Sequence, residues 1–87
     1  MHNKLEELIR IVESDGNNLS SVAYIGDDMN DAACMKAVKE AGGFTGCPKD
    51  AVKGIQKIAI FRSNNNGGNG AVRDFIEWIL SKNKYEL

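Results

Sequence analysis

Three aspartates follow a short apolar segment in the first third of the chain. The apolar residues 22–25 end at Gly26, and carboxylates follow at Asp27, Asp28 and Asp31. In open α/β sheets, ligands bind in the crevice beyond the carboxyl ends of parallel strands, where these side chains would lie. Mg²⁺ prefers carboxylates and water, and usually takes one or two carboxylates from the protein. The pattern indicates Mg²⁺-assisted chemistry on a phosphate, with Asp27 and Asp28 as metal ligands.

The same residues have an explanation that involves no ligand. Asn and Asp side chains accept hydrogen bonds from nearby backbone N–H groups, so Asp28 or Asn30 could cap the helix that follows. A calcium loop is excluded by spacing. Counted from Asp27, Met29 and Ala32 stand where an EF-hand requires an oxygen ligand and a glycine. The sequence alone leaves both a metal site and a helix cap open.

The composition is that of one globular domain. The 87 residues are 43% hydrophobic and 26% charged, so we treat residues 1–87 as a single unit. Eleven basic and twelve acidic residues give a net charge of -1, and no cluster of Lys and Arg is present along the sequence. This balance argues against nucleic acid as a partner.

Cysteine spacing and hydropathy indicate the compartment. Cys34 and Cys47 form no CxxC pair and have no His-rich companion segment, so neither a zinc site nor a disulfide framework is indicated. No segment approaches the roughly 18 consecutive apolar residues of a membrane span, and the start of the chain lacks the apolar core of a signal peptide. We therefore expect a soluble, cytoplasmic protein with free thiols and no membrane partner.

Apolar periodicity predicts alternating helices and strands. Helices are expected around residues 5–12, 30–41, 48–55 and 72–80, and strands around residues 22–25, 44–47 and 58–61. Glycines at positions 16, 42 and 43 are expected to end the first two helices. Pro48 is expected at the first position of the third helix. This order predicts a parallel α/β sheet of three strands joined by right-handed crossovers.

The order of elements is that of an incomplete domain. A doubly wound α/β domain normally begins with a strand at the sheet centre, whereas this chain begins with a helix. The strands at residues 22–25 and 58–61 are apolar on both sides and are expected to be covered on both faces. An unpaired strand edge readily pairs with another chain, so we expect a homo-oligomer.

Three segments in this order resemble the carboxyl-terminal half of a haloacid dehalogenase (HAD) superfamily phosphatase. They are residues 22–31, residues 47–53 and residues 67–77, and the resemblance extends from Lys4 to Leu80. The subgroup that the chain is similar to contains 3-deoxy-D-manno-octulosonate 8-phosphate (KDO 8-phosphate) phosphatase and the phosphatase-like domains of acylneuraminate cytidylyltransferases. The resemblance implies a Rossmann-like fold, a Mg²⁺ cofactor and a sugar-phosphate substrate.

The resemblance also implies roles for residues around the aspartates. Asp27 matches the family's Mg²⁺-ligating aspartate, and Asp31 matches the carboxylate that shapes the outer shell of the metal. Lys4 matches the lysine that pairs with the phosphoryl group, where an ammonium offsets the charge of carboxylates and phosphate. The alternative for Lys4 is a solvated residue near a chain end.

A glycine-rich segment completes the set implied by the resemblance. Gly67, Gly68, Gly70 and Arg73 match a segment that borders the entrance of the active site, so we expect them to contact substrate. Glycine permits positive φ and close approach to a ligand, and Arg73 could bind a carboxylate or phosphate. The alternative is a flexible loop; a P-loop is excluded because no Gly-Lys-Ser/Thr follows.

The chain departs from the family at the nucleophile. The family's Asp-x-Asp motif, which supplies the nucleophile and the general acid/base, has no match here, and we expect no activity from this chain alone. Two other interpretations stay open. The chain could be a non-catalytic oligomerisation module attached to an acylneuraminate cytidylyltransferase, or a small Mg²⁺- or phosphate-binding α/β domain unrelated to HAD enzymes.

Overall fold

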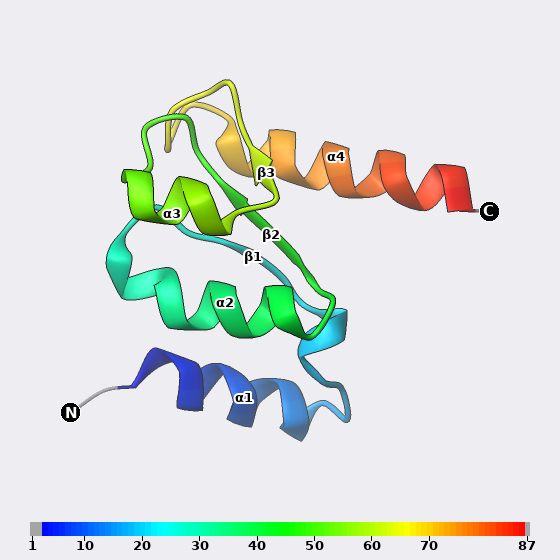
Figure 1. Cartoon of the computed structure of the whole chain (residues 1–87). Coiled ribbons are helices and arrows are strands. Elements are labelled where there is room, and N and C mark those ends of the chain that lie inside the picture. Colours follow the sequence, from blue (N-terminus) through cyan, green and yellow to red (C-terminus); the bar gives the residue numbers. More distant parts are fainter. Residues whose placement is uncertain (1–2, 87) are drawn as a thin grey trace.

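The predicted alternation of helices and strands is present in the protein (Figure 1). The computed structural model describes the backbone of residues 3–86 and the side chains of residues 3–82. Two short 3-10 turns, Leu19–Ser21 and Met29–Asp31, precede β1 and α2. The elements in chain order are α1 (Lys4–Ser14), β1 (Ala23–Ile25), α2 (Ala32–Glu40), β2 (Phe44–Cys47), α3 (Lys53–Ile58), β3 (Phe61–Arg62) and α4 (Ala71–Glu86).

The three strands form one parallel sheet in the order β1-β2-β3. In register, Ala23 lies beside Phe44 and Ile25 beside Gly46, while Cys47 lies beside Arg62. The predicted α/β class and the parallel sheet are confirmed. β1 is at one end of the strand order, so within the described residues it pairs only with β2.

Helices α2 and α3 cover one face of the sheet. Successive side chains of a strand point to opposite faces, and Cys47 of β2 packs in a buried cluster with Met35 of α2 and Ile55 of α3. These three side chains have 0% exposure. Helix α1 packs against α2 on the side away from α3 (Figure 1). This face therefore holds the closed core of the molecule.

Helix α4 covers the opposite face. Phe44 of β2 makes an edge-to-face contact with Trp78, at 5.6 Å between ring centroids. A Cβ on Gly46, two residues along the same strand, would lie 2.6 Å from the ring of Phe75. The glycine therefore allows α4 to approach the sheet closely. Phe61 stacks on Phe75 and Trp78, so the aromatic cluster joins α4 to β3 as well.

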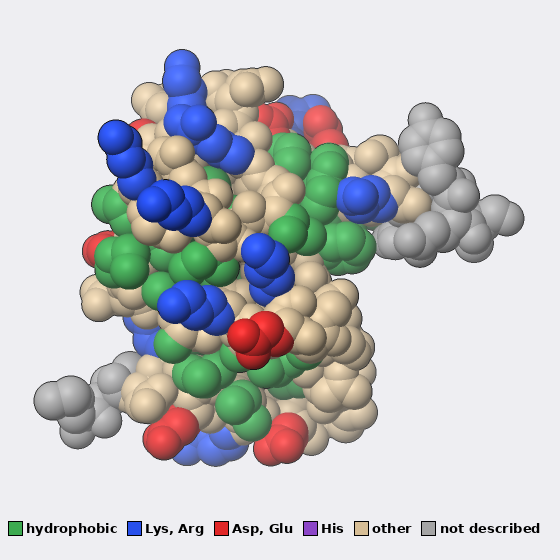
Figure 2. All heavy atoms as spheres, in the orientation of Figure 1, with side chains coloured by type: hydrophobic (Ala, Val, Ile, Leu, Met, Phe, Trp, Pro, Cys, Tyr) green, Lys and Arg blue, Asp and Glu red, His purple; other side chains and the backbone are tan. Residues whose placement is uncertain are grey.

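Basic side chains gather on the outer surface of the α2–α3 layer (Figure 2). Lys36 and Lys39 are exposed on α2, and Lys53 and Lys57 are exposed on α3. The linear sequence did not indicate this grouping, because the lysines come from two helices. Glu40 is exposed on the same helix as the first pair. We assign these side chains to solvation of the helical layer, where long lysines keep their charged ends in water.

Two predictions around the third helix were wrong. Pro48 does not begin the helix: its carbonyl accepts the Ala51 N–H in a turn, and α3 starts only at Lys53. Residues 58–61 are not a buried strand, since Ile58 ends α3, Ile60 is 47% exposed and the strand β3 begins at Phe61. A short apolar run fits a helix end as well as a strand, and periodicity does not separate them. The strand at residues 22–25 was also expected to be buried on both faces of the sheet, and this was wrong because Ala23 is exposed.

Candidate functional site

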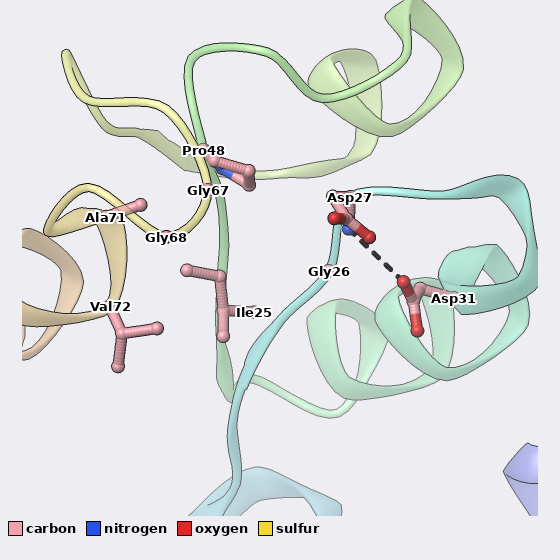
Figure 3. A pocket seen from close by; sticks show the side chains of 9 residues that line it. All are labelled: Ile25, Gly26, Asp27, Asp31, Pro48, Gly67, Gly68, Ala71 and Val72. Atoms are coloured by element: carbon pink, nitrogen blue, oxygen red, sulfur yellow. Dashed lines mark hydrogen bonds between the residues drawn. The ribbon is translucent and has the colours of Figure 1, made fainter.

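A pocket of about 280 Å³ lies at the carboxyl end of β1 (Figure 3). Gly26, Asp27 and Asp31 form one side, and Gly67 and Gly68 of the loop before α4 form the other. The remaining lining residues are mainly apolar and comprise Ile25, Pro48, Ala71 and Val72. Folding thus brings two of the three predicted aspartates and part of the predicted glycine segment to one place, as expected for the carboxyl end of parallel strands.

Asp31 is the most tightly held carboxylate of the site. Its Oδ1 accepts hydrogen bonds from the Tyr24 hydroxyl at 2.8 Å and from the Lys4 ammonium at 3.3 Å. Its Oδ2 accepts the backbone N–H groups of Asp27 and Asp28 at 3.2 and 3.3 Å. Both oxygens are therefore occupied by donors from α1, from β1 and from the turn that follows β1.

The charge of Asp31 is stabilised by these donors. Partial burial opposes ionisation, but the hydrogen bonds from Tyr24, the two amides and Lys4 outweigh it and lower the pKa of Asp31. Tyr24 shows the reverse effect. Burial and its hydrogen bond to the Asp31 carboxylate raise the pKa of the phenol. The site therefore keeps a neutral tyrosine beside a fixed negative charge.

Gly26 allows this arrangement, because a side chain would not fit at the end of β1. A Cβ there would lie 2.6 Å from the Asp31 Cβ and 2.9 Å from the Met35 sulfur. Contacts under 3.0 Å require that a neighbour move. The glycine therefore lets the turn bring Asp31 directly against the strand end.

Asp28 serves as a helix cap. Its side chain accepts the Met29 N–H at 2.6 Å, and together with Asp31 it forms a reciprocal capping box at the turn Met29–Asp31. It is not among the residues that line the pocket. Asp27, in contrast, lines the pocket, is exposed and makes no side-chain hydrogen bond within the described residues. The two neighbouring aspartates thus have different environments.

The donor set at the pocket fits Mg²⁺ only with help from other ligands. Among the described side chains of residues 3–82, no three His, Cys, Asp or Glu are placed to hold a metal ion together. Mg²⁺ accepts one or two carboxylates and completes its octahedron with water and phosphate oxygens. Asp27 can supply such a direct ligand, and Asp31 a second charge nearby.

Lys4 joins the first residue of α1 to the site through its contact with Asp31. Its side chain is 52% exposed, so the ammonium is reachable from solvent. An ion pair of this exposure contributes little to stability. The contact therefore favours a role for Lys4 in the site over a purely solvated side chain.

The glycine loop is fixed by residues that the sequence did not single out. The Gly67 N–H donates to Asp50 Oδ1 at 2.9 Å. Asp74, in the first turn of α4, accepts hydrogen bonds from Ser63 at 2.5 Å and from the Asn65 amide at 2.7 Å. These polar contacts join positions far apart in sequence. The one sequence signal for these contacts was Asp74, because an acidic residue in the first turn of a predicted helix often binds donors near the start of that helix.

Gly70 and Arg73, which were also predicted to contact substrate, do not line the pocket. Gly70 has φ of 100° and Gly68 has φ of 86°, conformations that glycine adopts readily. Of the two, only Gly68 lines the pocket. Arg73 pairs with Glu77 at 3.1 Å, and its side chain is 84% exposed. The structure therefore supplies no contact between Arg73 and the aspartates.

Comparisons with known proteins agree with the resemblance seen in the sequence. No protein-family model matches the chain. It is 36% identical over 80 residues to the N-acylneuraminate cytidylyltransferase A of Danio rerio, which covers 92% of this chain and 18% of that protein. No helix within the described residues is long and apolar enough to cross a membrane.

Two solved structures share the fold. One is the KDO 8-phosphate phosphatase of Moraxella catarrhalis in complex with magnesium ion, phosphate ion and KDO, with a TM-score of 0.80 and 32% identity. The match covers 91% of this chain and 43% of that one. The other is a hypothetical protein of Xanthomonas campestris, with a TM-score of 0.81, 26% identity, and coverage of 93% and 42%. The chain thus spans less than half of the solved relatives and about a fifth of the cytidylyltransferase.

Proposed function

We propose that this chain, which has the fold of part of a HAD-type phosphatase, forms the Mg²⁺- and phosphate-facing side of a sugar-phosphate phosphatase site. The observation that supports the proposal is the pocket in which Asp27, Asp31 and the glycine loop meet (Figure 3). The substrate we propose is a phosphate ester of a 3-deoxy sugar acid of the nonulosonate or sialic-acid pathway. The related phosphatase in complex with KDO, phosphate and magnesium supports this choice.

Four residues of the pocket lining, together with Lys4, have proposed roles. Asp27 is a direct Mg²⁺ ligand, and the bound ion would supply neutralisation of phosphate charge. Asp31 stays ionised and orients the Lys4 ammonium, which offsets the charge between carboxylates and phosphate. Gly67 and Gly68 form the opposite border, where backbone can approach the substrate.

We further propose that these 87 residues alone hydrolyse no phosphate ester. Covalent phosphoryl transfer needs a nucleophile and an acid/base partner within hydrogen-bond reach of each other. The other two strands of the described sheet end at Cys47 and Arg62, neither of which is a carboxylate. Asp31 is engaged by its four donors. Asp27 is the other carboxylate of the pocket lining, and the proposal assigns it to Mg²⁺, so no further lining carboxylate is left to attack phosphorus.

A Mg²⁺ titration followed by backbone amide shifts tests the metal role. We expect shifts at residues 26–31 and an affinity of about millimolar or weaker, because one carboxylate supplies few of the ligands. Asp27→Asn should abolish these shifts, and the matched Asp28→Asn variant should keep them, since Asp28 caps a turn. Equal loss of the amide shifts in both variants would show that Asp28 is also a Mg²⁺ ligand. An absence of shifts in the wild type would contradict the proposed Mg²⁺ site.

An assay of the isolated chain with Mg²⁺ against a panel of sugar phosphates tests the catalytic part. We expect no turnover above background. Turnover that disappears in Asp27→Ala would contradict the proposal, because it would require a nucleophile among these 87 residues. The two experiments are independent, since binding can succeed where hydrolysis fails.

A docking or oligomerisation module is the second candidate function. Two observations favour it: an exposed apolar stripe on α4, formed by Val72, Ile76 and Leu80, and strand β1, which within the described residues pairs with β2 alone. Free strand edges and contiguous apolar surface mark interaction sites. We propose a homo-oligomer that uses this surface. Cys34 and Cys47 are buried free thiols, which favours a cytoplasmic location for either function.

A further inference from the structure

Two Asn-Gly pairs lie in the loop that borders the pocket, and the fold holds their glycine amides differently. The pairs are Asn66 with Gly67 and Asn69 with Gly70, and all four residues are exposed. The Gly67 N–H donates a hydrogen bond of 2.9 Å to the Asp50 carboxylate. The Gly70 N–H makes no hydrogen bond within the described residues. The same dipeptide therefore occurs twice in one loop, once restrained and once free.

Asn-Gly pairs are reactive because glycine has no Cβ to shield its backbone nitrogen. That nitrogen attacks the side-chain Cγ of the preceding asparagine, forming an N–C bond while the C–N bond to the amide breaks and ammonia leaves with the proton of the glycine N–H. The product is a five-membered imide. Water then adds to either imide carbonyl, which gives aspartate or isoaspartate.

The hydrogen bond to Asp50 opposes the first step. The attacking nitrogen must lose its proton, and an N–H held by a carboxylate must first leave that bond. Hydrogen bonds to charged groups are among the stronger ones in proteins, so the restrained pair should react about tenfold or more slowly than the free pair.

We propose that Asn69 is a spontaneous deamidation site of the folded protein, and that Asp50 protects Asn66 from the same reaction. The inference does not depend on the proposed function. Conversion of Asn69 places a new carboxylate two residues before the start of α4, and isoaspartate lengthens the backbone between Gly68 and Ala71, which line the pocket. The reaction therefore changes the charge and shape of the pocket border.

The test follows both asparagines in one peptide. Trypsin cleavage after Arg62 and Arg73 releases residues 63–73, which contain both pairs. After incubation of the folded protein at mildly alkaline pH, tandem mass spectrometry locates the amide-to-acid change. We expect Asn69 to convert about tenfold or more faster than Asn66. In concentrated urea the two rates should converge, because the difference comes from the fold.

Variants separate the role of Asp50 from other effects of the loop. Asp50→Ala should raise the conversion of Asn66 towards that of Asn69, whereas the control Asp15→Ala, on the exposed end of α1, should change neither rate. If Asp50→Ala fails to fold, the wild-type ratio in buffer and in urea still decides. Equal rates in the folded protein, or an unchanged Asn66 rate in folded Asp50→Ala, would overturn the proposal. So would an Asn69 rate no faster than that of Asn64, which is followed by asparagine.

Discussion

The two faces of the sheet differ in how completely the chain covers them. On the α2–α3 face, Met35, Val38 and Ile55 have 0% exposure. On the other face, α4 buries Phe75 to 3% exposure but leaves Ile76, its neighbour in sequence, at 50%. Helix α4 therefore carries apolar side chains that the sheet does not cover. One face holds the closed core, and the other leaves apolar side chains of α4 exposed to solvent.

The two walls of the pocket differ in their surroundings. Asp31 lies where the covered face meets the end of β1, and donors from three segments hold it. The opposite wall is the glycine loop ahead of α4, next to the exposed Val72. The solved phosphatase contains more than half of its chain outside the region matched here. The exposed side of α4 is the surface that the proposed homo-oligomer would bury.

The largest expected effect contrasts two isoleucines, one from each face. Ile55→Ala removes a fully buried side chain and should lower the free energy of unfolding by about 2–5 kcal/mol. Ile76→Ala removes a half-exposed one and should change it by less than about 0.5 kcal/mol at concentrations where the chain is monomeric. Chemical denaturation measures both values. Similar losses in the two variants would mean that the faces are equally closed.

A smaller effect is expected where α4 meets the sheet most closely. Gly46→Ala would place a Cβ 2.6 and 2.8 Å from atoms of the Phe75 ring, and overpacking of this kind costs about 1–3 kcal/mol. The matched control is Gly67→Ala, whose Cβ would meet its nearest neighbours at 3.7 Å. Thermal or chemical unfolding of both variants tests the difference. A neutral Gly46→Ala would show that α4 is free to shift, and that the aromatic contact is loose.

The smallest expected effect on stability concerns the pH dependence at Asp31. Its pKa is lowered in the folded protein, so the ionised carboxylate stabilises the fold. This stability is fully present above the ordinary Asp value of 3.8 and is lost as pH falls through the lower folded pKa. Asp31→Asn should flatten the acid limb of a stability-versus-pH curve, whereas the exposed Asp15→Asn should leave it steep. An unchanged acid limb in Asp31→Asn would assign the dependence to other groups.

The sequence predicted what local pattern determines. The alternation of elements, the parallel sheet and the position of the aspartates after β1 follow from runs of apolar residues, glycine stops and the rules for parallel sheets. The strand Phe44–Cys47 is confirmed with its predicted bounds. The different environments of Asp27 and Asp28 could not be predicted from the sequence, because aspartate is a common side chain both in helix caps and in metal sites.

The sequence could not supply contacts between distant segments. Lys4 meets Asp31, and Asp50 meets Gly67, across stretches of chain that no periodicity relates. The third strand was misplaced for a similar reason: α3 extends to Ile58, and the Ile60 N–H donates to the hydroxyl and carbonyl oxygens of Thr45, a contact between distant segments. Only the folded structure shows which apolar segments pair with a neighbouring strand and which continue a helix.

Sedimentation equilibrium over a wide concentration range tests the central claim, that the exposed stripe of α4 is a surface for self-association. We expect the wild type to self-associate, because the β1 edge and the α4 stripe are available to a second copy. Ile76→Lys on the stripe should shift the chain to monomer with its fold retained, and Ile11→Lys, at a comparably exposed position of α1, should not. A well-folded wild-type monomer at the highest concentration would contradict the account and favour a self-sufficient small domain.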